Sequence, residues 1–291
     1  MGVVVYTLDS FTKDNHGGNP AGVVLEADAL SDIQMLQIAN QVGFSETAFV
    51  HKSDKATFKL RFFTPNSEVE LCGHATIAAF SLLRSKGLIG NGVFSQETQA
   101  GILGIVVDHD IVYMNQTLPI YYEVLDKAEI ADSLNISLND YLDNLPAQIV
   151  STGLKDAIIP VKSIEILFSI QPDCAKISQL SKKYNAVGFH VFSLETRFGA
   201  TAHCRNFAPL YDINEESATG TSNGALACYL HTYGVINKKS PSEFVFEQGY
   251  SMGKPSEILA RLAIKENLIN EVQVGGRAII RNVLEFNHCR I

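Results

Sequence analysis

The chain has 291 residues, which at roughly 150 residues per domain predicts about two domains. Hydrophobic residues make up 46% of it and charged residues 19%, a composition that excludes an intrinsically disordered protein. Lysine and arginine total 23 against 31 acidic residues, so the formal net charge is -8, and the sequence contains no basic cluster. Nucleic acid is therefore not expected as a partner.

No membrane partner is expected either, because the longest apolar runs fall far short of the roughly 20 residues that a spanning helix needs. The first residues show neither the basic stretch nor the cleavage site of a secretion signal. The five cysteines are widely spaced and form no C-x-x-C pair, which is typical of reduced thiols. We therefore expect a cytoplasmic protein that acts on a small molecule.

Short strand-like runs dominate the first part of the chain. Strands are predicted over Val3–Leu8, Gly22–Leu25 and Ala56–Phe63, and the last of these alternates apolar with polar residues. The runs Ile102–Val107 and Ile111–Asn115 are separated by three polar residues, a pattern that predicts a hairpin.

Helical patterns are fewer. The first predicted helix covers Ser31–Val42, where Ser31 is the expected N-cap and Gly43 the expected terminating residue. Three further helices are predicted over Ala75–Ser85, Pro172–Lys183 and Ser222–Tyr233. A final strand is predicted over Ala278–Phe286.

Internal repetition is the most informative feature of the sequence. Val42-Gly43-Phe44 recurs as Val187-Gly188-Phe189, and at nearly the same spacing Arg61-Phe62-Phe63-Thr64-Pro65 recurs as Arg205-Asn206-Phe207-Ala208-Pro209. In each half an acidic stretch then leads to a glycine, Gly73 or Gly220, that opens an apolar helix. Three matches in one order predict two copies of a single structural unit.

Each copy is expected to be a mostly antiparallel sheet around a buried helix, which makes the fold class α+β. The spacing of the repeats sets a boundary near Leu118-Pro119. The last predicted strand is expected to return to the first half. The predicted domains are therefore residues 1–117 plus 278–291 and residues 118–277.

Two predicted helix starts are rich in glycine and small polar residues, at Gly73-His74 and at Gly220-Thr221-Ser222. The first turn of a helix presents free backbone N–H groups and the positive end of the helix dipole, which suit an anion. If the two halves face each other, both helix starts point into one cleft suited to a carboxylate. The alternative is that these glycines are ordinary turn residues.

Glu46 lies in a strand-like run between apolar Phe44 and Ala48, where its carboxylate would be partly desolvated and suited to general acid/base chemistry. A glutamate that merely faces solvent is the alternative. His74 is either a helix-start cap or a proton shuttle, and Cys72 either a nucleophile at a helix start or a buried inert thiol. Glu216 either serves the site or only complements the dipole of the helix that follows it.

Several familiar motifs are missing or incomplete. No phosphate-binding loop of the G-x-x-x-x-G-K-[ST] or G-x-G-x-x-G type is present, so no nucleotide cofactor is expected. The histidines and cysteines lack metal-ligand spacing, so no metal is expected. Gly249–Gly253 matches the G-x-S-x-G pattern of hydrolases, but a strand-like run follows it where that motif requires a helix.

The sequence resembles the PhzF-like phenazine-biosynthesis family of isomerases, relatives of diaminopimelate epimerase. The resemblance covers nearly the whole chain. Its motifs are Asp9-Ser10-Phe11, Gly18-Asn19-Pro20-Ala21-Gly22, Ser45-Glu46-Thr47-Ala48-Phe49, Phe63-Thr64-Pro65, Glu68-Val69, Leu71-Cys72-Gly73-His74-Ala75-Thr76 and Gly253-Lys254-Pro255-Ser256. It implies a diaminopimelate epimerase-like fold of two pseudo-symmetric barrel-like domains, each around a central helix, with the active site between them. It also implies a cofactor-free isomerase that is often a homodimer.

The resemblance also implies roles for individual residues. Glu46 matches the family's catalytic acid/base, and His74 matches its helix-start histidine. In the second half Glu216 replaces the family's usual aspartate and Thr221 its usual serine, which makes the substrate differ more than the chemistry. Catalysis is thus assigned to Glu46, His74 and Glu216. Substrate binding is assigned to Asn19, Gly73, Gly220, Thr221 and Ser222.

The epimerase relatives use two opposed cysteines, one before each central helix. Cys72 fills the first of these positions, but Thr219 stands at the second, so a two-thiol racemase is disfavoured. The expected function is a cofactor-independent proton shift on a small carboxylate-bearing metabolite. The alternatives are an epimerase or racemase of amino or imino acids with the same fold, and a non-catalytic small-molecule binding protein.

Overall fold

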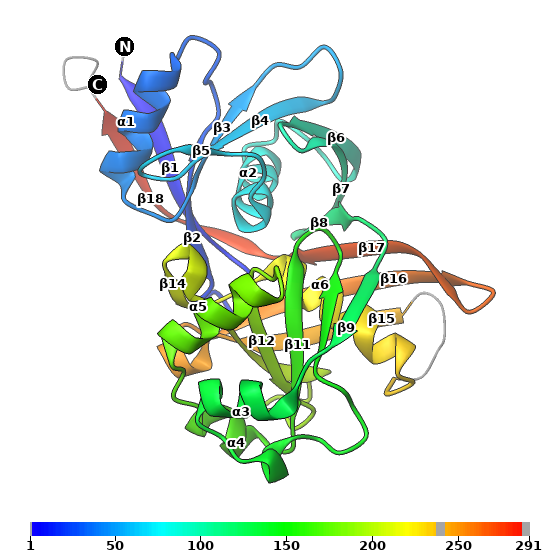
Figure 1. Ribbon diagram of the computed structural model, residues 1–291. Coiled ribbons are helices and arrows are strands. Elements are labelled where there is room, and N and C mark those ends of the chain that lie inside the picture. The colour runs from blue at the N-terminus through cyan, green and yellow to red at the C-terminus, as the bar shows by residue number, and fades with distance from the viewer. Residues whose placement is uncertain (1, 237–241, 287–291) are drawn as a thin grey trace. The chain divides into compact units, whose positions relative to one another are not determined.

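In the computed structural model, which describes residues 2–236 and 242–286, the chain divides into two units (Figure 1). The first unit comprises Met1–Asn115 and Gly275–Ile291, and the second comprises Gln116–Val274. Residues 287–291, at the end of the predicted first domain, lie outside the described residues, and so does Cys289. None of the helices in the described part of the chain combines the length and apolarity that a membrane span requires.

The first unit is built from strands with one inner and one outer helix. Its elements are β1 (Val3–Ser10), β2 (Asn19–Val24), α1 (Asp32–Val42), β3 (Thr47–His51), β4 (Phe58–Phe63), β5 (Glu68–Val69), α2 (Gly73–Ser85), β6 (Gly92–Thr98), β7 (Gly101–Asp108), β8 (Ile111–Gln116) and β18 (Ala278–Phe286). The predicted hairpin is confirmed, since β7 and β8 pair around a turn in which His109 has a positive φ of 56°.

The second unit has additional helices on its outer side. Its elements are β9 (Ile120–Val124), α3 (Lys127–Leu134), β10 (Gln148–Ser151), β11 (Lys155–Val161), α4 (Ile164–Ser169), α5 (Cys174–Lys183), β12 (Gly188–Ser193), β13 (Ala202–Ala208), β14 (Ile213–Glu216), α6 (Gly220–Thr232), β15 (Ser242–Gln248), β16 (Ser256–Lys265) and β17 (Leu268–Gly276). Short 3₁₀ turns lie at Leu138–Asp140, Pro209–Tyr211 and Tyr250–Met252.

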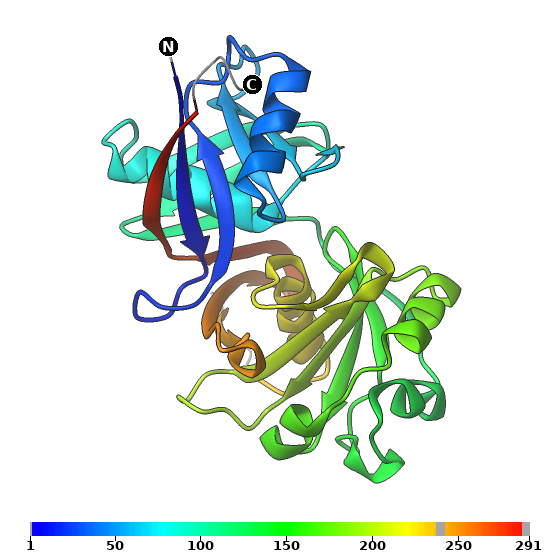
Figure 2. The same ribbon diagram turned by 90° about the vertical axis from the view of Figure 1, so that its left-hand side faces the viewer.

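Strand pairing in the first unit is mostly antiparallel. β1 lies between β2 and β18 and runs antiparallel to both, as Figure 2 shows for the N-terminal and C-terminal strands. β2 pairs in parallel with β3, which pairs antiparallel with β4. β4 then pairs antiparallel with β5 and in parallel with β6. The predicted return of the last strand to the first half of the chain is confirmed by the β1–β18 pairing.

The second unit shows the same succession of pairings. β10 pairs antiparallel with β9 and β11, and β11 pairs in parallel with β12. β12 pairs antiparallel with β13, which pairs antiparallel with β14 and in parallel with β15. Both units therefore contain mixed sheets of antiparallel and parallel strands.

One of the predicted repeats is wrong as a structural equivalence. Gly43 ends α1 in the left-handed conformation with φ 72°, whereas Gly188 opens strand β12. The second repeat gives a different alignment of the two units. In it Phe63 of β4 matches Phe207 of β13. Thr47 pairs with Phe63 and Phe189 pairs with Phe207, so Thr47, and not Phe44, corresponds to Phe189. A short Val-Gly-Phe match carries no information about conformation, since glycine is allowed in both the helix-ending and the extended region.

Local signals set the helix ends. Ser31 caps α1 through a capping box, in which its side chain accepts from the Gln34 N–H and the Gln34 side chain accepts from the Ser31 N–H. Gly43 ends the same helix, as predicted. The predicted third helix starts later than expected, at Cys174, because Asp173 rather than Pro172 is its N-cap.

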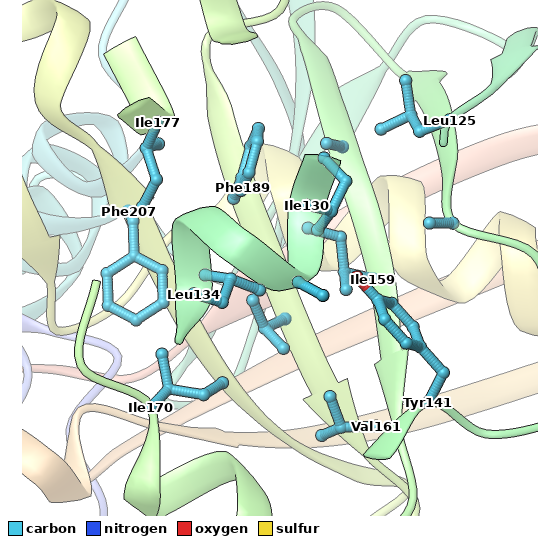
Figure 3. Close-up of a cluster of buried hydrophobic side chains, with 14 of the residues drawn as sticks. Leu125, Ile130, Leu134, Tyr141, Ile159, Val161, Ile170, Ile177, Phe189 and Phe207 are labelled. Atoms are coloured by element: carbon cyan, nitrogen blue, oxygen red, sulfur yellow. The ribbon is translucent and has the colours of Figure 1, made fainter. Parts of the chain in front are cut away.

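A central helix runs through each unit and is buried almost all round. Nearly every residue from His74 to Leu83 of α2 is buried, and so is every residue from Ser222 to His231 of α6. Such helices are apolar on all sides because strands surround them. In the second unit a further hydrophobic core lies between α3–α5 and the outer face of the strands, where Ile130 and Ile177 pack with Phe189 and Phe207 (Figure 3).

Candidate active site

The first helix turn of α2 lies next to the segment that leads into β3. Nε2 of His74 is 3.3 Å from Oε2 of Glu46. Glu46 precedes β3 rather than lying within it, so the predicted strand-like run is correct only from Thr47 onward. The strand places Glu46 at its N-terminal end, and the helix places His74 in its first turn.

The Glu46 carboxylate is unevenly exposed. Its side chain is 20% exposed overall, but Oε2 is closed to solvent and has no hydrogen-bond partner within the described residues. Nε2 of His74 is therefore only 3.3 Å from Oε2 of Glu46, but the two atoms are not aligned for a hydrogen bond. A buried acceptor without a partner is costly, and such groups occur where a ligand or a transferred proton completes the site.

The imidazole of His74 is 7% exposed and is surrounded by polar groups. The Asn19 side-chain amide lies 3.4 Å from Nδ1, and the Ser45 hydroxyl lies 3.4 Å from Nε2. Ser10 donates a 2.7 Å hydrogen bond to the His74 carbonyl and so holds the helix turn itself. Asn19, predicted to bind substrate, is brought into contact with the histidine and fixes the orientation of its ring.

Cys72 is the N-cap residue of α2, but its side chain makes no capping hydrogen bond. Its Sγ lies 3.4 Å from Nδ1 and 3.9 Å from Nε2 of His74. The first intrahelical bond is donated by the N–H of Thr76 to the Cys72 carbonyl. The N–H groups of Gly73, His74 and Ala75 therefore have no intrahelical acceptor, which makes this turn suited to an anion.

No structural constraint within the fold demands a glycine at position 73. A Cβ atom added there would meet only Met114 Cε, at an ordinary 3.6 Å. Gly73 is not among the glycines with a positive φ. Because glycine has no side chain, a ligand can approach the backbone closely at this position.

Glu46, Cys72 and His74 also form a group of possible metal ligands. One donor atom from each residue lies within 4.8 Å of the other two. Among the described residues, this is the group of three histidine, cysteine or acidic side chains whose donor atoms come this close. The spacing of cysteines and histidines along the chain did not indicate it, because Glu46 comes from a distant segment.

The equivalent turn in the second unit begins at α6. Thr219, its N-cap, donates a 2.6 Å hydrogen bond from Oγ1 to Oε2 of Glu216. Gln248 of β15 donates to the Glu216 carbonyl at 2.8 Å and accepts from the Thr219 N–H at 3.2 Å. Glu216 is thus held by its own unit, and no sequence pattern indicated that Gln248 takes part in holding it.

The two acidic residues before α6 have different roles. Glu215 forms a two-pronged ion pair with Arg205, at 2.9 Å for both hydrogen bonds. Arg61 holds Glu68 in the same way, at 2.7 Å for both. The repeated arginine of the sequence is therefore structural. Glu215 belongs to that ion pair, whereas Glu216 accepts the hydrogen bond of Thr219.

The side chain of Ser222 is engaged within the second unit. It is 1% exposed, donates to Oδ2 of Asp156 at 2.8 Å and accepts from the Asn206 amide at 3.2 Å. Its hydroxyl therefore points into the unit, and only its backbone N–H resembles the predicted anion site. Burial raises the pKa of Asp156 to about 7; the Ser222 hydrogen bond opposes the rise, and the negative charge of Glu216 adds to it.

Gly220 and Thr221 open α6 with the first intrahelical bond donated only by Asn223. Thr152 donates a 3.3 Å hydrogen bond to the Thr221 carbonyl, as Ser10 does to the His74 carbonyl in the first unit. Both helix starts are thus braced by a hydroxyl from a neighbouring strand end. Neither Ser10 nor Thr152 could be found from spacing, since hydroxyl residues of this kind are common in any chain.

The hydrolase motif does not form a nucleophile elbow. Ser251 lies in the short 3₁₀ turn between β15 and β16 and donates to Oε1 of Glu215 at 2.5 Å. A strand follows it instead of a helix, as the sequence predicted, so the arrangement that exposes a serine nucleophile is missing.

The family model and the curated relatives that match this chain point to the same group of proteins. The family model PhzC-PhzF, phenazine biosynthesis-like protein, matches residues 8–282. An uncharacterized isomerase of Clostridium acetobutylicum is 36% identical over 288 residues, which cover 95% of each chain. The trans-2,3-dihydro-3-hydroxyanthranilate isomerase of Pseudomonas fluorescens is 28% identical over 280 residues, covering 94% of this chain and 95% of that protein.

A solved structure agrees with them. The crystal structure of a phenazine biosynthesis protein of the PhzF family from Bacillus anthracis matches with a TM-score of 0.91 and 32% identity, covering 99% of each chain. The family model and these relatives span nearly the whole chain, and the curated relatives are named as isomerases. This protein therefore belongs to the PhzC-PhzF family of phenazine biosynthesis-like proteins and is an isomerase.

Proposed function

We propose that the chain catalyses a cofactor-independent proton shift, a tautomerisation, on a small metabolite that carries a carboxylate. The observation that supports this most directly is the Glu46 carboxylate, with one oxygen buried and without a hydrogen-bond partner beside the ring of His74. A carboxylate of this kind is poised to take a proton and to hold it until it is returned.

The proposed reaction moves one proton within the substrate. Glu46 removes it from one carbon, the double bond shifts, and the same carboxylic acid returns the proton to a second carbon on the same face. His74 hydrogen-bonds to the substrate from the adjacent helix start. The N–H groups of Gly73 and His74 hold the substrate carboxylate and stabilise the negative charge that develops next to it.

The proposed reaction needs one acid/base, Glu46, whereas epimerisation of the two-thiol type needs two. A racemase of the two-thiol type needs a second acid/base at the position of Thr219, but the Thr219 hydroxyl is already bonded to Glu216 at 2.6 Å. A threonine hydroxyl is also far too weak an acid to replace a thiol. The names of the relatives as isomerases argue equally against a protein that only binds its ligand.

The two units are proposed to be pseudo-symmetric copies of one ancestral unit. The shared succession of strand pairings supports this, and so do the matching arginine–glutamate pairs, Arg61 with Glu68 and Arg205 with Glu215. If so, Glu216 is placed at the second helix start as a contact for the substrate, and the first helix start carries the chemistry.

The experiment is solvent-deuterium exchange. The purified protein is incubated in D₂O with small unsaturated carboxylates, starting with trans-2,3-dihydro-3-hydroxyanthranilate, the compound named for the Pseudomonas fluorescens relative. The proposal expects a product with a shifted double bond, formed by wild-type protein and lost in Glu46→Gln. Exchange with inversion at one carbon would identify an epimerase instead, and binding without exchange would leave only a binding protein.

A further inference from the structure

We propose that Gln248 is a positioning residue for the second helix start, where it directs the Thr219 hydroxyl onto Glu216 and so keeps Oε2 of Glu216 an unprotonated acceptor. The consequence for catalysis rests on the proposed function, in which Glu216 is a contact for the substrate. The direction of the hydrogen bonds does not, because it is a property of the second unit alone.

Main-chain groups fix the orientation of the Gln248 side-chain amide. The Glu216 carbonyl can only accept and lies 2.8 Å from Nε2, whereas the Thr219 N–H can only donate and lies 3.2 Å from Oε1. Turning the amide round would oppose an oxygen to the carbonyl and an N–H to the N–H. Gln248 is fully buried at the end of β15, so these two contacts set its orientation.

The second hydrogen of the same amide determines where the Thr219 hydroxyl points. Nε2 of Gln248 donates it to Oγ1 of Thr219 at 3.1 Å. The hydroxyl then donates its own proton to Oε2 of Glu216 at 2.6 Å. A length of about 2.5–2.7 Å is typical of a hydroxyl that donates to an ionised carboxylate. Oε2 of Glu216 is therefore an acceptor without a proton of its own.

Two further buried side chains hold the Gln248 amide from behind. Nδ2 of Asn223 donates to Oε1 of Gln248 at 2.8 Å and to the Thr219 carbonyl at 2.9 Å. Oδ1 of Asn223 thus faces Nε2 of His190 at 3.3 Å, so Nε2 must carry the ring proton. Burial lowers the pKa of His190 to about 4, which leaves the ring neutral at neutral pH and makes its Nδ1 an acceptor.

The far side of the His190 ring is bound in the same sense. The side-chain amide of Asn206 donates to Nδ1 of His190 at 3.2 Å and to the Ser222 hydroxyl at 3.2 Å. Ser222 in turn donates to Oδ2 of Asp156 at 2.8 Å. The network therefore branches at Asn206 and ends on a carboxyl oxygen at both ends, Asp156 and Glu216. Each donor between them has one acceptor, so the network favours a single arrangement of its protons.

In the first unit the related contact stops at the helix. There Gln96 of β6 donates to the Thr76 hydroxyl at 3.2 Å, and Thr76 donates to the Cys72 carbonyl at 2.8 Å. Oε2 of Glu46 has no hydrogen-bond partner among the described residues. An unbonded oxygen suits a carboxylate that carries a proton, whereas the bonded oxygen of Glu216 suits a fixed acceptor.

The tautomer of His190 tests the network without any substrate. Nitrogen-15 NMR of the histidine-labelled full-length protein should show Nε2 protonated and Nδ1 unprotonated between about pH 6 and pH 8. The variant His190→Gln identifies the signals, because they alone disappear from the spectrum. A proton on Nδ1, or a charged ring at pH 7, would mean that the amides of Asn223 and Gln248 are turned round, and would overturn the proposal.

The variant Gln248→Glu tests the positioning role. It preserves the size of the side chain, but a carboxyl group supplies at most one hydrogen where the amide supplies two, so the Thr219 hydroxyl loses its fixed direction. In the deuterium-exchange assay KM should rise by about fivefold or more, while kcat falls less. Circular dichroism establishes that the variant is folded. Gln37→Glu, at an exposed position of α1, is the matched control.

The variant Thr219→Val separates positioning from a general loss of stability. It removes the hydroxyl through which Gln248 is proposed to act, so KM should rise as in Gln248→Glu. The double variant should then have a KM within about twofold of that of Thr219→Val alone, because the two changes break one path. Effects on KM that multiply, or an unchanged KM in Gln248→Glu, would overturn the positioning role.

Failure of the proposed function is recognised separately. If wild-type protein exchanges no deuterium with any substrate tried, the proton shift is wrong, whereas the His190 tautomer still decides the direction of the network. If exchange occurs and depends on Glu46 but not on Gln248, the proton shift stands and the positioning role fails.

Discussion

Oε2 of Glu46 lies 3.3 Å from Nε2 of His74, and the two residues come from different elements of the first unit. Glu46 stands at the entry to β3, and His74 stands in the first turn of the buried helix α2. Glu46 directly precedes the buried strand β3, and His74 is in a helix that is buried almost all round, so both residues are anchored next to regular elements of one unit. A carboxylate positioned in this way can both take up and return a proton with little rearrangement.

Replacement of Glu46 by glutamine should abolish most of the proton transfer and leave ligand binding intact. Glutamine has nearly the same size but cannot carry the proton, so the rate should fall by roughly 10²–10⁴-fold, as is typical for a lost general acid/base. Deuterium exchange measures the rate and calorimetry the binding. Exposed Glu26→Gln is the control. A Glu46→Gln enzyme with most of its exchange activity would rule out the assigned role.

Replacement of Cys72 by serine should have a small effect on the reaction. Because the second thiol of a two-thiol racemase is replaced by Thr219, Cys72 is not expected to act as a base, and the rate should stay within about tenfold, or roughly 1.4 kcal/mol of barrier. The measurement is deuterium exchange at saturating substrate. A thousandfold loss would favour thiol chemistry and restore the racemase as the better interpretation.

Replacement of Gly73 by alanine should weaken substrate binding without unfolding the protein. The added Cβ meets only Met114 Cε at 3.6 Å, so the fold accommodates it, but it stands where a bound carboxylate approaches the first turn of α2. KM should rise while the melting temperature stays within a few degrees of that of the wild type. Gly90→Ala, whose Cβ would meet nothing within 4 Å, is the matched control. An unchanged KM would place the substrate carboxylate elsewhere.

Replacement of Glu216 by glutamine should reduce activity less than replacement of Glu46. Its Oε2 already accepts the Thr219 hydroxyl at 2.6 Å, and a glutamine oxygen can accept the same bond, so the turn before α6 should survive. We expect a higher KM with a moderate loss of turnover, measured in the same exchange assay. If Glu216→Gln lost the activity that Glu46→Gln kept, the roles of the two residues would have to be exchanged.

Replacement of Asp156 by asparagine should change how stability depends on pH. Burial, with a contribution from Glu216, raises the pKa of Asp156 to about 7 in the folded protein, whereas an unfolded aspartate titrates near about pH 3.9. Between these values the folded form binds the extra proton. The stability that this group contributes is therefore complete below about pH 4 and is lost as the pH rises through about 7.

Asparagine has no proton to lose, so the free energy of unfolding of Asp156→Asn should rise relative to the wild type between about pH 5 and pH 8. The upper limit of that rise is about 3 kcal/mol, because a tenfold change in proton affinity corresponds to about 1.4 kcal/mol. Urea unfolding at the two pH values gives the comparison, with exposed Asp54→Asn as the control. A difference between variant and wild type that does not change with pH would show that Asp156 titrates normally.

Much of the local structure is determined by the sequence itself. Ser31 and Gly43 set the ends of α1 because a side-chain cap and a left-handed glycine act within one helical turn. The turn around His109 and the alternation in β4 are equally local. The motifs around Glu46 and His74 identify the family, because they are specific runs of residues and do not depend on the path of the chain.

Only the tertiary structure decided which side chains meet. It separated Glu215, held by Arg205, from Glu216, and it turned the Ser222 hydroxyl inward onto Asp156. It also brought Cys72 and His74 close to Glu46, which no spacing could indicate. The physical reason is that caps, turns and alternation depend on neighbours in sequence, whereas a contact between distant residues depends on how strands and helices pack around a shared core.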